Sequence, residues 1–237
     1  MNETADPQRG WTRRKGLAHC TALLALAVGL GRDSLAANAA LAADGERILV
    51  VGDSLSAEYG LTRGSGWVSL LEQRLARENL RASVVNASIS GDTTSGGRAR
   101  FRPLLEQRKP TLVIIELGGN DALRGLPLEE TRLNLASMAK DAKATGARVL
   151  LVGMQVPPNY GRKYSDDFAA IYANVAKAEG AALVPFMLKG VADIANSESM
   201  FQADRIHPVA AAHPIILKNI WPVLEPMLRQ PTRAAMR

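Results

Sequence analysis

The sequence predicts an α/β protein, a three-layer α/β/α sandwich with a central parallel sheet of about five strands. Two observations support this prediction. After Asp44, short β-branched or aliphatic runs alternate with stretches of helical period, and a turn rich in Gly, Asp and Ser follows each run. Several runs are apolar at almost every position, which is typical of strands that helices cover on both faces.

The five predicted strands are all short. In chain order they are Arg47–Val51, Ala82–Asn86, Thr111–Leu117, Arg148–Gly153 and Ala182–Pro185. Between them, apolar residues recur at helical spacing, first at Trp67, Leu70, Leu71 and Leu75 and then at Leu133, Leu135, Met138 and Ala142. A last helix is predicted from about Ile215 to Leu228. Because no repeat, low-complexity tract or linker interrupts this pattern, residues 43–237 are predicted to form one domain.

The segment before this domain is predicted to be an export signal. A basic cluster at residues 13–15 precedes an apolar run from Leu17 to Leu30, which at about fourteen residues is too short to span a bilayer. Ala40-Leu41-Ala42 then has the A-x-A form of a signal-peptidase site. We therefore expect residues 1–42 to be a cleaved signal peptide and the mature chain to be periplasmic or secreted. The alternative is an uncleaved membrane anchor.

Charge and cysteine content exclude several classes of function. The formal net charge is +6, but residues 43–237 hold 24 Lys and Arg against 20 Asp and Glu without clustering, which predicts a mixed surface and no nucleic-acid partner. The single cysteine, Cys20, lies in the leader, so the domain has no disulfide, thiolate nucleophile or thiolate metal site. No Gly-x-Gly-x-x-Gly or Gly-Lys-Ser/Thr motif indicates a nucleotide site.

Three turns after predicted strands carry unusual sets of polar residues: 52–56 after the first, 90–93 after the second and 118–121 after the third. In an open parallel sheet, ligands bind at the carboxyl ends of the strands, so these turns are expected to meet at one edge. Each turn also has a purely structural explanation, because Asp, Ser, Thr and Asn cap helices and Gly favours turns.

A fourth element, just before the last helix, contains Asp204 and His207. Residues three apart in a tight turn point the same way, so the Asp204 carboxylate can accept the His207 Nδ1 proton and leave Nε2 free. A serine becomes nucleophilic only when such a base is within reach, and Ser54 is the serine at the first strand end. The pattern predicts a Ser54, His207 and Asp204 triad. The alternatives are a surface ion pair that caps a helix, or a metal site with His213 as a third ligand.

The same turns offer donors for an oxyanion. The backbone N–H groups of Ser54 and Gly91 and the side-chain amide of Asn120 are predicted to stabilise negative charge on a reacting carbonyl oxygen. Asp53 is expected to fix the turn that carries Ser54 or to cap the helix that follows.

Taken together, these residues resemble those of the SGNH, or GDSL, hydrolases, in which Ser54, Gly91, Asn120 and His207 here match the four named positions. The likeness extends through 52–57, 86–93, 116–125 and 157–161 to the last helix. Within the family it is strongest to the periplasmic multifunctional branch, whose members combine acyl-CoA thioesterase, lysophospholipase and arylesterase activities. The resemblance implies a flavodoxin-like sheet and chemistry with no metal and no cofactor.

Two positions differ from the family pattern. The family usually has Gly where this chain has Arg205, and often Asn where it has Val209. If the turn between Asp204 and His207 needs a conformation that glycine favours, Arg205 is expected to carry backbone strain.

The expected activity is hydrolysis of carboxylic esters and thioesters through an acyl-serine intermediate. Pro157, Pro158 and Asn159, in the loop after the fourth strand, are predicted to bind substrate. The expected partners are small acyl esters, acyl thioesters and lysophospholipids, with no stable membrane insertion after signal cleavage, and the chain is expected to be a monomer or weak dimer. Two alternatives remain open: a carbohydrate-ester deacetylase, and an exported acyl-binding module without turnover.

Overall fold

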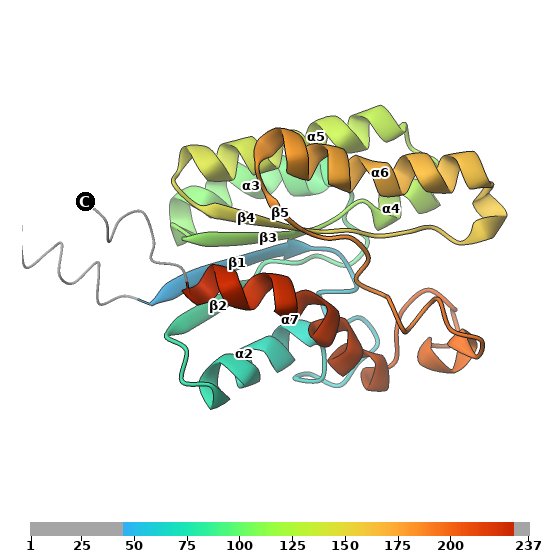
Figure 1. The fold of residues 1–237 in the computed structure, drawn as a ribbon, viewed down its shortest axis with the longest axis horizontal. Coiled ribbons are helices and arrows are strands. Elements are labelled where there is room, and N and C mark those ends of the chain that lie inside the picture. Colours follow the sequence, from blue (N-terminus) through green and yellow to red (C-terminus); the bar gives the residue numbers. More distant parts are fainter. Residues whose placement is uncertain (1–44, 230–237) are drawn as a thin grey trace, which may run out of the picture. The chain divides into compact units, whose positions relative to one another are not determined.

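The computed structural model describes residues 45–229, apart from the side chain of Pro158. Its centre is a parallel five-stranded sheet in the order β2-β1-β3-β4-β5 (Figure 1). The strands are β1 (Glu46–Gly52), β2 (Ala82–Asn86), β3 (Leu112–Glu116), β4 (Arg148–Val152) and β5 (Ala182–Val184). All five differ from their predicted bounds by at most one residue at either end, and the predicted fold class is confirmed.

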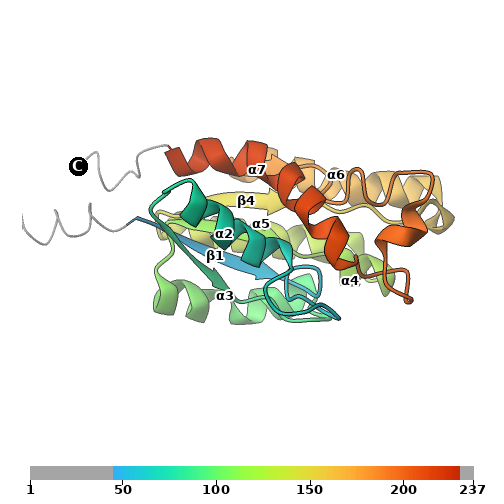
Figure 2. The same ribbon diagram turned by 90° about the horizontal axis from the view of Figure 1, so that it is seen from below.

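Helices cover both faces of this sheet, which makes the three layers (Figures 1 and 2). One face carries α2 (Trp67–Arg77) and α7 (His213–Arg229). The other face carries α3 (Thr94–Arg108), the short α4 (Gly119–Leu123), α5 (Leu128–Ala144) and α6 (Arg162–Glu179). The predicted last helix is present as α7 and begins two residues earlier than expected. Within the described residues, no helix is long and apolar enough to cross a membrane.

The core lies around β1, β3 and β4. Every residue of β3 is buried, whereas the edge strand β2 is only half-buried, as expected from its position at the end of the strand order. Large apolar side chains from both helical layers complete the core, among them Trp67 of α2 and Phe101 of α3. Each fully buried side chain of this kind contributes about 1.5–3 kcal/mol relative to exposure, so the centre of the sheet is its most rigidly packed part.

The buried face of α5 differs from the expected one at one position. Leu133 is 43% exposed, whereas Leu135, Met138 and Ala142 are buried. Two polar residues, Thr131 and Asn134, are buried on the inner face instead. They hydrogen-bond to Asp121 and Thr94, with which they form a buried polar cluster described in the next subsection, so local hydrophobicity did not decide which residues face inward.

The strand order also locates the site. The chain leaves β1 towards β2 on one side and later returns to β3 on the other, so the connections diverge between β1 and β3. In an open parallel sheet a crevice forms at the carboxyl ends of the strands at such a switch point. The turns that follow β1 and β3, which contain Ser54 and Asn120, both lie at this crevice.

Candidate active site

Ser54 lies at the start of a helical turn that follows β1 directly. Asp53 organises this turn: its Oδ1 accepts a hydrogen bond from the Leu55 N–H at 3.0 Å, and its carbonyl oxygen accepts one from the Ala57 N–H at 2.9 Å. The expected role of Asp53 in fixing the turn is therefore seen in the structure. A short side-chain bond of this type pre-sets the turn and points the Ser54 hydroxyl out of the sheet edge.

Asp204 and His207 lie in the loop before α7. Asp204 Oδ1 accepts hydrogen bonds from the backbone N–H groups of Ile206 and His207, both at 3.0 Å. Its Oδ2 lies 2.6 Å from His207 Nδ1. The backbone bond from His207, the ring bond and the bond from Ile206 lower the pKa of Asp204 to about 2. The carboxylate is thus ionised at neutral pH and holds the imidazole with Nδ1 protonated.

Arg205, between these two residues, adopts a left-handed backbone conformation with φ of 58°. The expectation that this turn needs a conformation favoured by glycine is therefore confirmed. A side chain other than glycine in this region costs on the order of 1 kcal/mol, so Arg205 carries strain next to the base.

The structure brings the predicted triad together. His207 Nε2 lies 2.9 Å from Ser54 Oγ, although the two residues are 153 positions apart. The Tyr59 ring packs against the His207 ring with centroids 4.3 Å apart. Gln202 ties the two loops, because its Nε2 donates to the Tyr59 carbonyl at 2.9 Å and to the Pro208 carbonyl at 3.2 Å. The loops of Ser54 and His207 are therefore held together by direct hydrogen bonds and ring packing.

Two further predicted donors lie at the same edge. Gly91 has φ of 78°, a conformation that glycine adopts without strain. The Asn120 amide nitrogen, Nδ2, donates to Asp53 Oδ2 and to the Asp92 carbonyl, each at 3.0 Å. Asn120 is thus oriented by the residue beside Ser54, a link that the sequence did not reveal. Asp53 is only 2% exposed, and this burial is the main reason that its pKa is raised to about 6.

A buried polar cluster, formed by Thr94, Asp121, Thr131 and Asn134, ties the turns of Gly91 and Asn120 together. Asp121 Oδ2 accepts a hydrogen bond from the Thr94 N–H at 2.8 Å, at the first turn of α3. Asn134 Nδ2 donates to Thr94 Oγ1 at 3.1 Å. Since α3 begins directly after the Gly91 turn, this cluster fixes the spacing between two of the three predicted oxyanion donors. Of its members, sequence reasoning singled out only Asp121, within the turn 118–121, and gave it no role of its own.

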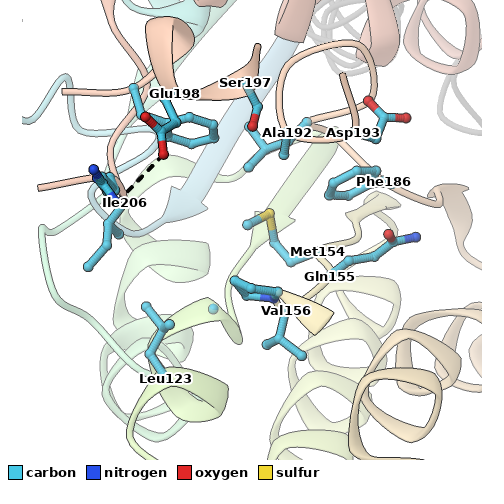
Figure 3. A pocket seen from close by; sticks show the side chains of 15 residues that line it. Leu123, Met154, Gln155, Val156, Phe186, Ala192, Asp193, Ser197, Glu198 and Ile206 are labelled. Atoms are coloured by element: carbon cyan, nitrogen blue, oxygen red, sulfur yellow. Dashed lines mark ion pairs between the residues drawn. The ribbon is translucent and has the colours of Figure 1, made fainter. Parts of the chain in front are cut away.

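An apolar cavity of about 480 Å³ is lined by neighbours of the triad and of Asn120, and Figure 3 shows its lining side chains. Its lining includes Gly119, the neighbour of Asn120, and Ile206, the neighbour of His207. Its other walls come from the loop after β4 and from the long segment after β5: Leu123, Met154, Gln155, Val156, Pro157, Phe186, Leu188, Ala192, Asp193, Ser197, Glu198, Phe201 and Arg205.

Of the three residues predicted to bind substrate, Pro157 lines the cavity and Asn159 does not. The side chain of Pro158 lies outside the described residues. Sequence reasoning missed the contribution of the segment after β5. Its aromatic residues Phe186 and Phe201 could have been a signal, but nothing local linked them to the crevice.

The metal alternative can be compared with the observed contacts. Residues 45–229 contain no group of three or more His, Cys, Asp or Glu side chains arranged to hold an ion. His213 is buried, and its Nδ1 accepts a hydrogen bond from the Trp67 N–H at 3.0 Å. Burial lowers the pKa of His213, which makes it a neutral link between α7 and α2.

Comparison with known proteins identifies the family. Residues 50–215 match the GDSL-like Lipase/Acylhydrolase family. "Esterase TesA" of Pseudomonas aeruginosa is 55% identical over 183 residues, covering 77% of this chain and 90% of that protein. "Thioesterase 1/protease 1/lysophospholipase L1" of Escherichia coli K12 is 40% identical over 187 residues, covering 79% and 87%.

A solved structure agrees with this likeness. A crystal structure of TesA superposes with a TM-score of 0.74 at 54% identity, covering 77% of this chain and 99% of that one. The family match spans the turns that contain Ser54, Gly91 and Asn120 and the loop of Asp204 and His207. The chain therefore belongs to the GDSL-like lipase/acylhydrolase family, and it is a serine esterase of the SGNH class.

Proposed function

We propose that Ser54, His207 and Asp204 perform the ester hydrolysis, with Ser54 as the nucleophile, His207 as the general base and Asp204 as its orienting acid. The observation that supports this assignment is the continuous chain of contacts, 2.6 Å from Asp204 to His207 Nδ1 and 2.9 Å from His207 Nε2 to Ser54 Oγ. Both distances are short enough for direct hydrogen bonds, which is what proton transfer requires.

In the first half of the reaction, Ser54 Oγ attacks the carbonyl carbon and its proton passes to His207 Nε2. The tetrahedral intermediate collapses when the C–O or C–S bond to the leaving group breaks, and His207 gives its proton to the departing alcohol or thiol. A water molecule then repeats these steps on the acyl-serine: its proton passes to His207, its oxygen bonds the acyl carbon, and Ser54 Oγ leaves and takes the proton back. The products are a carboxylic acid and free enzyme.

The oxyanion hole consists of the Ser54 and Gly91 N–H groups and the Asn120 amide. Asn120 already donates one hydrogen to the Asp92 carbonyl, a neutral acceptor. A developing oxyanion is a stronger acceptor than a neutral carbonyl, so that hydrogen is donated to the substrate as charge builds up. Asp53 Oδ2 continues to accept the other amide hydrogen and so holds the Asn120 side chain in its orientation. Because these donors stabilise the charged transition state more than the neutral ground state, they accelerate the reaction.

The substrates are acyl esters and thioesters, including aryl esters, acyl-CoA and lysophospholipids, whose acyl chain occupies the cavity beside the triad. The cavity wall is largely apolar, with Met154, Phe186 and Phe201 among its larger side chains. Apolar burial gains about 0.8 kcal/mol for each covered methylene, so catalytic efficiency is expected to rise over several methylenes and then level off. A strict preference for acetyl esters would favour the carbohydrate-ester deacetylase.

We further propose that residues 1–42 are removed on export, that residues 43–237 form the mature domain, and that the mature enzyme acts in the periplasm or outside the cell. The basic cluster, the short apolar run and the Ala40-Leu41-Ala42 site support this proposal. Protein recovered from the periplasm should begin at or near Ala43. An N-terminus that still contains Arg13 and Arg14 would favour the membrane anchor.

Substitution of the nucleophile tests the assignment. Ser54→Ala is expected to fold normally and to lose at least about three orders of magnitude in kcat on a nitrophenyl ester, because within residues 45–229 Ser54 Oγ is the hydroxyl that hydrogen-bonds His207 Nε2. A fluorophosphonate probe should label Ser54 in the wild type and nothing in the variant. Ser83→Ala, at an exposed position of β2, serves as a check that labelling is specific to position 54. If the wild type shows no burst of nitrophenol and no labelling, the chain is a binding module.

A further inference from the structure

A buried carboxyl group lies directly beneath the nucleophile turn, and the reaction described above does not use it. Glu116 is the last residue of β3 and is fully buried. Its Oε2 accepts a hydrogen bond from Ser56 Oγ at 2.7 Å and a longer one from the Asp53 N–H at 3.4 Å. The approach is close enough that a Cβ at Gly52 would lie 2.7 Å from this oxygen. Burying a carboxyl group costs free energy, so we expect Glu116 to have a role that offsets this cost.

Glu116 joins the nucleophile turn to the helical layer that carries the base loop. Ser56 Oγ, which contacts Glu116, also accepts a hydrogen bond from the Trp67 indole N–H at 3.1 Å. The Trp67 backbone N–H in turn donates to His213 Nδ1 at the start of α7. On this side, Glu116 therefore anchors the turn that follows Ser54.

On its other side, Glu116 borders Asp53, the residue that orients Asn120. Asp53 accepts hydrogen bonds from the Leu55 N–H and from Asn120 Nδ2, both at 3.0 Å. Its backbone N–H points at Glu116. A shift of the Glu116 carboxyl would thus displace the Asp53 backbone and, with it, the carboxylate that holds Asn120.

Two buried carboxyl groups this close cannot both be charged without a large penalty, so one of them keeps a proton. Asp53 has two strong donors that favour its ionised form, whereas Oε1 of Glu116 has no hydrogen-bond partner among the described residues. Burial, followed by the charge of Asp53, raises the pKa of Glu116 well above its usual value. The charged and titratable groups around the pair are His207 and Asp92 near Asp53, and Tyr172, whose raised pKa includes an effect of Glu116.

We propose that Glu116 is a positioning residue that works as a neutral carboxylic acid, holding Ser56 and the Asp53 backbone so that the Asp53 carboxylate keeps Asn120 aimed at the oxyanion. The inference rests on the proposed oxyanion role of Asn120. Glu116 touches no reacting atom, and its effect reaches the reaction through Asp53 and Asn120.

The test compares two substitutions of Glu116 in the full-length chain. Glu116→Gln keeps the size, the neutral state and an acceptor for Ser56, and it should retain kcat within about threefold of the wild type. Glu116→Ala removes the support, and it should lower kcat on the order of thirtyfold with KM little changed, a loss below that of deleting an oxyanion donor. A Gln variant as slow as the Ala variant would overturn the proposal, because it would show that a charge is required.

A double substitution separates positioning from general damage. Because Glu116 acts through Asn120, adding Glu116→Ala to Asn120→Ala should lower kcat by no more than about twofold further. If the double variant instead lowers kcat by the product of the two separate losses, the proposal is overturned. Ile114→Ala is the matched control, since Ile114 is fully buried on the same face of β3 and has no polar contact to lose. It should lower stability without the loss in kcat, and an equal loss in kcat would reduce Glu116 to a packing residue.

The Asn120→Ala variant alone tells the two proposals apart. If Asn120→Ala lowers kcat and the loss in the double variant is the product of the two single losses, the oxyanion role of Asn120 is supported and the proposed role of Glu116 is wrong. If its kcat is unchanged, the oxyanion assignment is wrong and the inference about Glu116 is overturned with it.

Discussion

Asp204 and Asp53 lie within electrostatic reach of the same His207, yet their surroundings shift their pKa values in opposite directions. Asp204 is in a largely exposed loop and accepts three hydrogen bonds from His207 and Ile206, so its pKa falls to about 2. Asp53 is buried, and the cost of burying its charge outweighs its hydrogen bonds, so its pKa rises to about 6. The candidate site therefore combines one carboxylate that stays charged at neutral pH with a second carboxylate that titrates near pH 6.

The two carboxylates also differ in where their partners come from. The hydrogen-bond donors to the Asp204 side chain lie within three residues along the chain. The loop before α7, here called the outer loop, therefore orients the Asp204 carboxylate without help from distant residues. The Asp53 carboxylate reaches Asn120, 67 residues away, and depends on the packing of β1 against β3. Asp204, the outer carboxylate, is therefore expected to respond mainly to substitutions in its own loop. Asp53, the inner carboxylate, is expected to respond to changes in the packing of the sheet.

The largest expected effect comes from the outer carboxylate. Asp204→Asn should lower kcat by about 10³–10⁴, because an amide no longer favours the tautomer of His207 that leaves Nε2 free to accept a proton. Steady-state kinetics on a nitrophenyl ester measures this loss. Asp166→Asn, which removes an exposed ion pair with Arg162, is the control. Retention of more than about a tenth of kcat would show that Asp204 is not the orienting acid.

A smaller loss is expected at the inner carboxylate. Asp53→Asn weakens the acceptor that holds Asn120, and kcat should fall about a hundredfold with KM nearly constant, since a misaligned donor fails only in the transition state. Asp141→Asn, which breaks the exposed pair with Arg102, should behave as the wild type. If KM rises instead, Asp53 and Asn120 bind the substrate in its ground state.

The pH dependence of kcat sharpens the comparison further. Asp204 remains ionised well below pH 4, whereas Asp53 takes up a proton as the pH falls through about 6. Protonated Asp53 is a weaker acceptor for Asn120, so wild-type kcat should fall as the pH drops through about 6. In Asn120→Ala the charge of Asp53 no longer matters, so the ratio of wild-type kcat to variant kcat should shrink over the same pH range. A ratio that does not change with pH would show that the protonation of Asp53 does not affect turnover.

The smallest effect is expected in stability. Arg205→Gly relieves the left-handed strain of the outer loop but loses a weak ion pair with Glu198 at 3.6 Å, drawn as a dashed line in Figure 3. The net gain in the free energy of unfolding should be about 1 kcal/mol or less, measured by urea titration. Arg63→Gly, an exposed loop arginine outside the positive-φ residues, is the control and should give no gain. An equal gain in both variants would show that backbone strain at Arg205 is not the cause.

Much of the fold and part of the site followed from the sequence alone. The strands were predictable because β-branched, apolar runs between Gly-rich turns are a local signal, and they matched the structure to within one residue. Ser54, Asp204 and His207 were predictable as a group because each lies in a short motif, and parallel strands must end at one edge. The strain at Arg205 was predicted from the resemblance to the family, which usually has Gly at this position.

Tertiary structure alone decided which polar residues are buried and what they contact. The sequence places Glu116 inside a predicted strand but names no partner for it, and only the fold buries its carboxyl against Ser56, 60 residues away. Likewise Thr131 and Asn134 take the inner face of α5 and leave Leu133 exposed, because Asp121 and Thr94 lie opposite. The physical reason is that local patterns record propensity and polarity, whereas burial and the pKa of a carboxyl group depend on neighbours that only folding brings into contact.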